Sequence, residues 1–215
     1  MAYSVLVLNG SPHVKGCTAR ALEEVIRILN EEGIETELVQ VGKENIRGCI
    51  GCEYCETHEG CVLKDKVNEV AAKLEKADGL IIASPVYYGS PNGNLISFLD
   101  RLFYSTGLTR RSGFSKHMKV GAAVVSCRRG GNTAAFDVLN KYFTISGMPV
   151  VSSTYWNQVH GFSAEDVEKD LEGLQTMRNL ARNMAFLIRA IGAEKGKNGL
   201  PAVEGDFFTS FPDGK

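Results

Sequence analysis

The chain has 215 residues, of which 44% are hydrophobic and 23% charged, a balance typical of a soluble globular protein with one large or two small domains. Its formal net charge of −1 gives no electrostatic reason to expect a nucleic acid or an anionic membrane as partner. The sequence lacks both the roughly 20 apolar residues of a membrane span and the basic and apolar regions of a signal peptide. We therefore expect a cytoplasmic protein, in which structural disulfides are rare.

Apolar runs alternate with helical stripes along the chain. The run at 3–8 is continuous and β-branched, which is typical of a strand buried on both faces. Further strands are predicted at 34–41, 80–84, 118–126 and 148–154, and helices at 19–33, 67–79, 94–105, 133–143 and 163–192. Ser163 and Asp166 form a candidate capping box at the start of the last helix, and Gly192 is its predicted end.

This alternation predicts an α/β fold, a doubly wound parallel sheet of five strands with helices on both faces. Residues 1–194 form the predicted domain, with a cysteine-rich insertion at 47–66 after the second strand and a C-terminal tail at 195–215. Three phenylalanines in the tail would be costly to leave in water, so the tail either docks or frays: Phe207, Phe208 and Phe211. In such sheets ligands bind beyond the carboxyl ends of the strands, where the strand order reverses.

The loop after the first strand, residues 9–18, joins a buried strand to a helix N-terminus. Gly10 and Gly16 permit close backbone approach, and Ser11 and Thr18 supply hydroxyl groups. Free N–H groups and the positive end of the helix dipole suit a phosphate. The glycine patterns of P-loop NTPases and of Rossmann dinucleotide sites are both absent. The alternative is a plain turn in which Thr18 caps the helix.

The loops after the third and fourth strands carry aromatic and basic residues. Tyr87 and Tyr88, in a loop with two prolines, suit the face of a flat heteroaromatic ring, unless they are simply surface tyrosines in a turn. Arg128 and Arg129, followed by two glycines, would place positive charge beside the electron-rich edge of a flavin. The alternative for the arginine pair is a solvated basic turn.

Four stretches of the sequence together resemble the NAD(P)H-dependent FMN reductases of the flavodoxin-like superfamily, and in particular the iron–sulfur flavoproteins. They are LNGSPHVKGCTARAL, CIGCEYCETHEGCVLKD, ASPVYYGSPNGNLISFLDR and the segment from Val125 to Gly161. The resemblance covers roughly residues 1–190 and implies a flavodoxin-like sheet with strand order 2-1-3-4-5. It also implies non-covalent FMN at the edge of the sheet and assembly as a homodimer or homotetramer.

The resemblance also implies which residues contact FMN. Those around the phosphate would be Ser11, His13, Cys17 and Thr18, with Lys15 compensating for a histidine where relatives often have arginine. Those bordering the ring would be Pro85, Val86, Tyr87, Tyr88 and Gly89, with Arg128, Arg129, Gly130 and Gly131 closing its pyrimidine side. Cys127, like Cys17, is interpreted as a small residue near the flavin rather than a metal ligand.

Four of the six cysteines lie in the insertion with the spacing C-x2-C-x2-C-x5-C: Cys49, Cys52, Cys55 and Cys61. The expected compartment disfavours a disulfide, and zinc sites usually join two C-x2-C pairs across a longer spacer. A tight arc of three thiolates with a fourth after a turn suits one face of an iron–sulfur cluster. Spacing and resemblance favour a [4Fe–4S] cluster, with zinc and unligated thiols as alternatives.

These features predict an FMN-dependent oxidoreductase. Electrons would pass from NAD(P)H or a ferredoxin through the flavin, and through the cluster if it is present, to a small-molecule or protein acceptor. The flavin carries the difficult chemistry, so no catalytic side chain is predicted. The alternatives are an electron-transfer flavoprotein without NAD(P)H turnover and a zinc-stabilised regulatory module.

Overall fold

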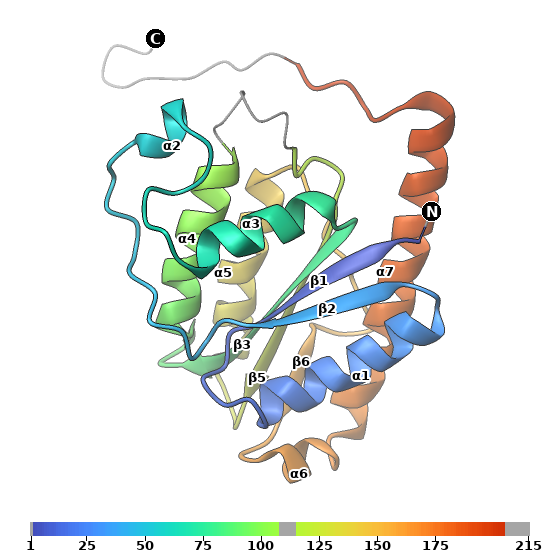
Figure 1. Cartoon of the computed structure of the whole chain (residues 1–215). Helices are drawn as coiled ribbons and strands as arrows, with labels where there is room; N and C mark the ends of the chain where they lie inside the picture. The colour runs from blue at the N-terminus through green and yellow to red at the C-terminus, as the bar shows by residue number, and fades with distance from the viewer. Residues whose placement is uncertain (1, 108–114, 205–215) are drawn as a thin grey trace, which may run out of the picture.

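A parallel five-stranded sheet forms the centre of the molecule (Figure 1). The computed structural model describes residues 2–107 and 115–204. The strands run in the order β2-β1-β3-β5-β6, which confirms the predicted order 2-1-3-4-5. Their bounds are β1 (Ser4–Asn9), β2 (Glu35–Gln40), β3 (Gly79–Tyr87), β5 (Val120–Cys127) and β6 (Gln158–His160).

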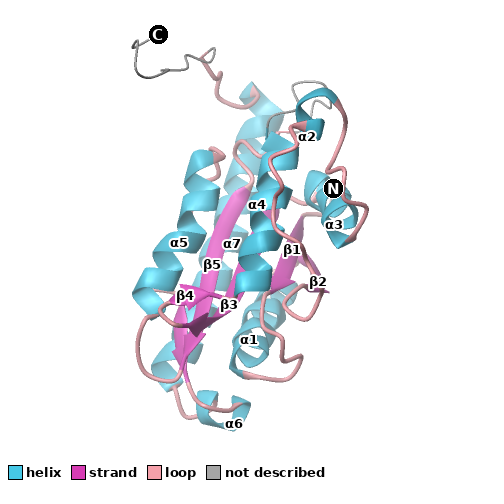
Figure 2. Cartoon of the chain, turned by 90° about the vertical axis from the view of Figure 1, so that its left-hand side faces the viewer, coloured by secondary structure: helices cyan, strands magenta, loops and turns pink. Residues whose placement is uncertain are grey.

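Helices enclose the sheet on both faces (Figures 1 and 2). One layer contains α1 (Cys17–Glu31), α6 (Ala164–Val167) and α7 (Leu171–Asn198). The other contains α3 (Lys66–Lys76), α4 (Gly93–Gly107) and α5 (Asn132–Ile145), and the short α2 (Tyr54–Thr57) lies in the cysteine segment. Alternate residues of β1 point into the two cores: Val5 and Val7 pack against α1 and α7, and Leu6 and Leu8 pack against α3 and α4. The apolar run at 3–8 therefore has the double burial expected from its composition.

The third strand extends beyond its predicted end and folds back on itself. β3 continues to Tyr87 and pairs in antiparallel fashion with β4 (Ser90–Pro91). The turn between them has positive φ at Tyr88 (50°) and Gly89 (74°). The predicted loop is therefore a tight hairpin, which holds Pro85, Val86 and Tyr87 in extended backbone.

The predicted position of the fifth strand, 148–154, is wrong. Only Val150 in that segment bridges to β5, through Gly121, and the regular pairing with β5 is made by Gln158–His160. Residues between them bond to α7 instead: Asn183 donates to the Ser152 carbonyl at 2.8 Å, and the Ser153 hydroxyl donates to the Thr176 carbonyl at 2.7 Å. The strand β6 carries polar residues, so no apolar run marked it.

The last predicted helix is two helices, and it ends later than expected. The capping box of Ser163 and Asp166 is present at the start of α6, but that helix is short, and Asp170 caps the new helix α7 by accepting from Gly173 N at 2.9 Å. Gly192 lies within α7 and does not end it. A β-carbon there would collide with the side chain of Tyr3, so this glycine permits close packing. The helix ends at Asn198, before Gly199 with φ of 81°.

The predicted tail begins within α7, because residues 195–198 are helical. Its three phenylalanines lie outside the described residues. Across the described part of the chain, no helix combines the length and the apolar character needed to cross a bilayer.

Candidate functional site

A pocket of about 550 Å³ opens at the carboxyl ends of β1, β3 and β5. All three predicted loops contribute to it, as expected where β1 and β3 continue the sheet in opposite directions. Nine of the predicted cofactor-binding residues line its wall: Ser11, His13, Lys15, Cys17, Thr18, Pro85, Val86, Tyr87 and Arg128.

The first loop is fixed by its own backbone. Gly10 N donates to the Ala83 carbonyl at 2.8 Å, and a β-carbon on Gly10 would lie 2.7 Å from that same oxygen. Ser11 N donates to Asn9 Oδ1 at 3.0 Å, and His13 N donates to Ser11 Oγ at 3.1 Å. Only glycine permits this approach between the first loop and β3, so the loop enters the pocket in one defined path.

Helix α1 begins at the pocket with Gly16 as its N-cap, and no side chain caps it. The alternative in which Thr18 caps the helix is therefore wrong. Thr18 is buried, and its hydroxyl bonds to Ser126 Oγ at 2.8 Å, which joins the first loop to the end of β5. The first N–H groups of α1 thus have no side-chain acceptor beside the pocket, an arrangement that suits an anion.

The remaining five predicted residues are absent from the pocket wall: Tyr88, Gly89, Arg129, Gly130 and Gly131. Tyr88 is fully exposed at the tip of the hairpin, and Arg129 and Gly130 are also exposed. Gly131, with φ of 86°, packs against the hairpin, since a β-carbon there would lie 2.9 Å from Gly89 Cα. The two glycines therefore join the second and third loops by direct backbone contact.

Sequence reasoning missed one wall of the pocket, the segment from Gly161 to Glu165 at the start of α6. Gly16, Ser126 and Cys127 also line the pocket. The capping box predicted a helix start at Ser163. The fifth strand, however, was predicted at 148–154 and lies at Gln158–His160, so the sequence did not identify Gly161 to Glu165 as the loop after that strand. Cys17 connects the wall to α1 by donating its Sγ hydrogen to the Gly161 carbonyl at 3.3 Å.

The two thiols in the pocket favour their protonated forms. Burial raises the pKa of Cys17, and the carboxylates of Asp166 and Glu165 raise it further. Burial also raises the pKa of Cys127, with a smaller contribution from Asp170. Neutral thiols are poor nucleophiles and poor metal ligands, which supports their interpretation as small packing residues.

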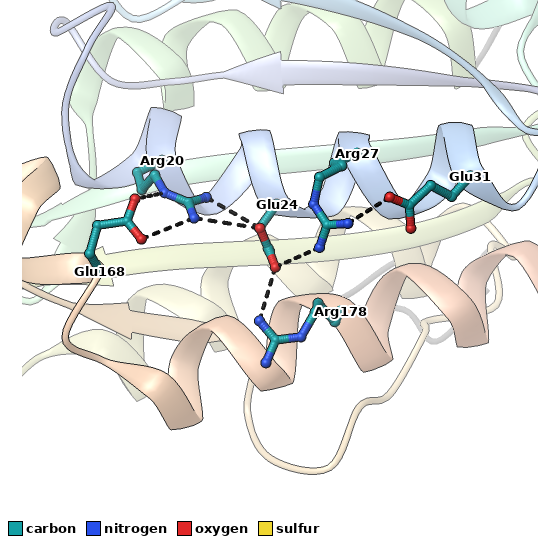
Figure 3. A network of polar contacts seen from close by, with 6 residues as sticks. All are labelled: Arg20, Glu24, Arg27, Glu31, Glu168 and Arg178. Atoms are coloured by element: carbon teal, nitrogen blue, oxygen red, sulfur yellow. Dashed lines mark hydrogen bonds and ion pairs between the residues drawn. The ribbon is translucent and has the colours of Figure 1, made fainter.

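An ion-pair network along α1 connects this helix to the end of α6 and to α7 (Figure 3). Arg20 on α1 pairs with Glu168, just after α6, through its Nε and Nη2 groups. Glu24 accepts from Arg27 and from Arg178 on α7, each at 2.9 Å. The residue after α6, helix α1 and helix α7 are thereby joined through charged hydrogen bonds.

The four cysteines of the insertion line a second, much smaller pocket, together with Arg101 and Tyr104 of α4. All six cysteines of the chain are free thiols. Burial raises the pKa of Cys55, and ionised Cys61, Cys49 and Cys52 would raise it further, so the four thiols are close enough to interact electrostatically. In the described ranges, however, no three His, Cys, Asp or Glu side chains are placed as metal ligands. The segment gathers a soft donor set that fits an iron–sulfur cluster or zinc, without converging the thiols on one point.

The role of Arg101 was also not predicted from the sequence. The sequence suggests a charge on the helix face or at an interface, but the residue is 1% exposed and bonds to the cysteine segment. Asp100 faces outward and accepts from the Tyr142 hydroxyl at 2.5 Å. Trp156 and His160, which lie beside or in β6, do not line the pocket.

Comparison with known proteins identifies the family. The family model for NADPH-dependent FMN reductases matches residues 3–162. The chain belongs to this family. Within it, the chain is 33% identical to an iron–sulfur flavoprotein of Methanocaldococcus jannaschii over 194 residues, which covers 87% of this chain and 98% of the relative. It is 29% identical to an iron–sulfur flavoprotein of Methanosarcina thermophila over 192 residues, covering 88% and 97%.

Solved structures confirm the flavodoxin-like fold of this FMN reductase family member. RosB with bound 8-demethyl-8-formylriboflavin-5′-phosphate superposes with a TM-score of 0.73 at 17% identity, covering 95% of this chain and 92% of RosB. The apo form of an NADH:FMN oxidoreductase gives a TM-score of 0.58 at 20% identity, covering 86% and 89%. The protein is a flavin-dependent oxidoreductase of the iron–sulfur flavoprotein group.

Proposed function

We propose that this reductase binds FMN in the pocket at the strand ends and passes electrons from a reduced donor, NAD(P)H or a ferredoxin, to a small-molecule or protein acceptor. The observation that carries the proposal is that the three predicted loops line one pocket where the sheet order reverses. RosB, which has the same fold, holds a riboflavin-5′-phosphate derivative, and this supports a flavin phosphate as the ligand here.

The phosphate would lie at the N-terminus of α1. The uncapped N–H groups of the first turn donate to it, and the Ser11 hydroxyl is within the same wall. Lys15 supplies a positive charge, and the His13 ring lies in the same wall. Thr18 acts indirectly, because its bond to Ser126 sets the position of the helix start.

The ring would lie against the extended backbone of Pro85, Val86 and Tyr87, with Arg128 lining the same pocket. Bound FMN supplies the hydride and electron-transfer chemistry. The side chains orient the ring, exclude water from it and place positive charge beside it. Tyr88, Gly89 and the turn from Arg129 to Gly131 shape the two loops that border the ring.

The four cysteines of the insertion would hold a [4Fe–4S] cluster. Their spacing, their shared pocket and the named relatives support this assignment. The need for reduced thiols supports a cytoplasmic location. We also propose that the protein assembles as a homodimer or homotetramer, which light scattering of the purified holoprotein would test.

Anaerobic purification followed by an absorption spectrum and iron and sulfide assays tests the cofactors. Flavin bands with about four irons per chain are expected; flavin without iron removes the cluster, and zinc in place of iron supports the structural alternative. Protein without flavin after incubation with FMN would refute the main proposal.

Anaerobic mixing with NADH, NADPH and reduced ferredoxin, each in a separate experiment, tests the donor. Rapid bleaching of the flavin by a nicotinamide supports the reductase activity. Bleaching by ferredoxin alone would identify an electron carrier without nicotinamide turnover.

A further inference from the structure

Arg101 lies on α4 beneath the cysteine segment and is among the largest fully buried side chains. A guanidinium group has five N–H donors, and each of them is used here. Nε donates to Cys61 Sγ at 3.3 Å. Nη1 donates to the Arg47 carbonyl at 3.1 Å and to Asp65 Oδ2 at 2.6 Å. Nη2 donates to the Leu63 carbonyl at 3.1 Å and to Asp65 Oδ1 at 2.9 Å.

These partners flank the cysteines on both sides. Arg47 precedes the first cysteine of the insertion, and Leu63 and Asp65 follow the last one. A single side chain therefore joins the two ends of the segment, and in doing so offsets part of the entropy that closing a loop costs. Its position is fixed in turn, because Asp65 caps α3 by accepting from Val67 N at 3.1 Å.

The contact with Cys61 has a second effect. An N–H group that donates to a ligand sulfur, and a positive charge beside it, both stabilise the more negative reduced state of an iron–sulfur cluster. Burying a guanidinium group costs desolvation free energy unless all its N–H groups have partners. Neutral side chains could hold the two ends of the segment together at a lower desolvation cost. The buried charge is therefore best explained by an electrostatic role at the thiolate.

We propose that Arg101 is a positioning residue for the cysteine centre: it holds the ligand segment closed before any cluster is inserted, and its Nε–H raises the reduction potential of the cluster through Cys61. The second half rests on the cluster assigned above. The first half concerns the metal-free chain and is independent of it.

The test uses two variants and one control in the full-length protein. The double variant Arg101→Met with Asp65→Asn removes both charges and keeps an asparagine able to cap α3, so it avoids leaving an unpaired carboxylate. The variant Arg101→Lys keeps the positive charge but cannot reach all the partners of the guanidinium group at once. The control Arg182→Met makes the same type of change at an exposed position of α7.

Two measurements follow. In metal-free protein, the rate of alkylation at the buried Cys55 and the half-buried Cys61 is expected to rise at least threefold in both variants and to stay at the wild-type value in the control, with the exposed Cys49 and Cys52 as internal references. In reconstituted protein, the cluster of the double variant is expected to be harder to reduce by about tenfold in its one-electron equilibrium, or about 59 mV, while the flavin potential stays unchanged.

Unchanged alkylation and an unchanged cluster potential in both variants would overturn the proposal. Circular dichroism identifies a variant that fails to fold, in which case the remaining variant decides. If wild-type protein takes up flavin but no iron, the cluster assignment and the potential effect both fail. The alkylation rates then still confirm or refute the closing role.

Discussion

Glu24 is the centre of the ion-pair network in Figure 3, and its replacement by glutamine gives a direct measure of what the network contributes. The residue is 7% exposed. Burial opposes its ionisation, but hydrogen bonds from Arg27 and Arg178, with the charges of Arg27 and Arg20, outweigh burial and lower its pKa from 4.5 to about 2.

The magnitude follows from linkage between ionisation and folding. Each pKa unit corresponds to about 1.36 kcal/mol, so the ionised carboxylate stabilises the fold by about 3 kcal/mol at pH 7. Because the folded pKa is the lower one, this contribution is complete above pH 4.5 and is lost as the pH falls toward 2. We expect Glu24→Gln to cost about 3 kcal/mol at pH 7 and about 2 kcal/mol at pH 3.5.

Urea unfolding of the two proteins at both pH values, followed by circular dichroism, measures these differences. Glu31→Gln is the matched control, since Glu31 lies on the same helix and pairs with Arg27 at 2.6 Å but is exposed. That variant should cost no more than about 0.5 kcal/mol at either pH. A Glu24→Gln difference below about 0.5 kcal/mol, or one that stays constant from pH 7 to pH 3.5, would refute the reasoning.

Three further predictions concern the pocket. Gly131→Ala forces a β-carbon to 2.9 Å from Gly89 Cα at φ of 86° and should weaken FMN binding about tenfold by fluorescence titration; Gly196→Ala, in open space on α7, should leave it unchanged. Thr18→Ala and Ser126→Ala should each lower the free energy of unfolding in urea by about 1 kcal/mol, because each leaves the other hydroxyl without its partner. The double variant removes both hydroxyls and should cost less than the sum of the two. Additive costs would contradict a direct bond. Ser163→Ala removes the capping box and should lower stability by about 1 kcal/mol; no change in the unfolding midpoint would show that the cap contributes nothing.

The sheet and the three loops could be predicted because their signals are local. The run around Val5 to Leu8 is apolar on both faces, and parallel topology places the loops after β1, β3 and β5 at one edge whatever the details of packing. Gly10 predicted a close backbone approach that the structure contains.

The parts that could not be predicted depend on contacts distant in sequence. Val150 and Val151 look like a strand, but side chains of α7 some thirty residues later bind the neighbouring backbone. Arg101 looks like an ordinary charge on a helix, because its partner Asp65 lies 36 residues earlier and no periodic pattern connects them. The pocket wall at Gly161 to Glu165 was not predicted, because the contacts with α7 led to a wrong position for the fifth strand, which precedes this wall.

Helix α4 has one further consequence. The cysteine-rich insertion is attached to its side through Arg101 and through the bond from Tyr104 to Glu56 at 3.1 Å. With a rise of about 1.5 Å per residue, Arg101 lies about 12 Å along the helix from Gly93, where α4 begins after the β3–β4 hairpin. The insertion is thus a separate unit held on a helix, and it could be exchanged between relatives while the pocket at the strand ends is left as it is.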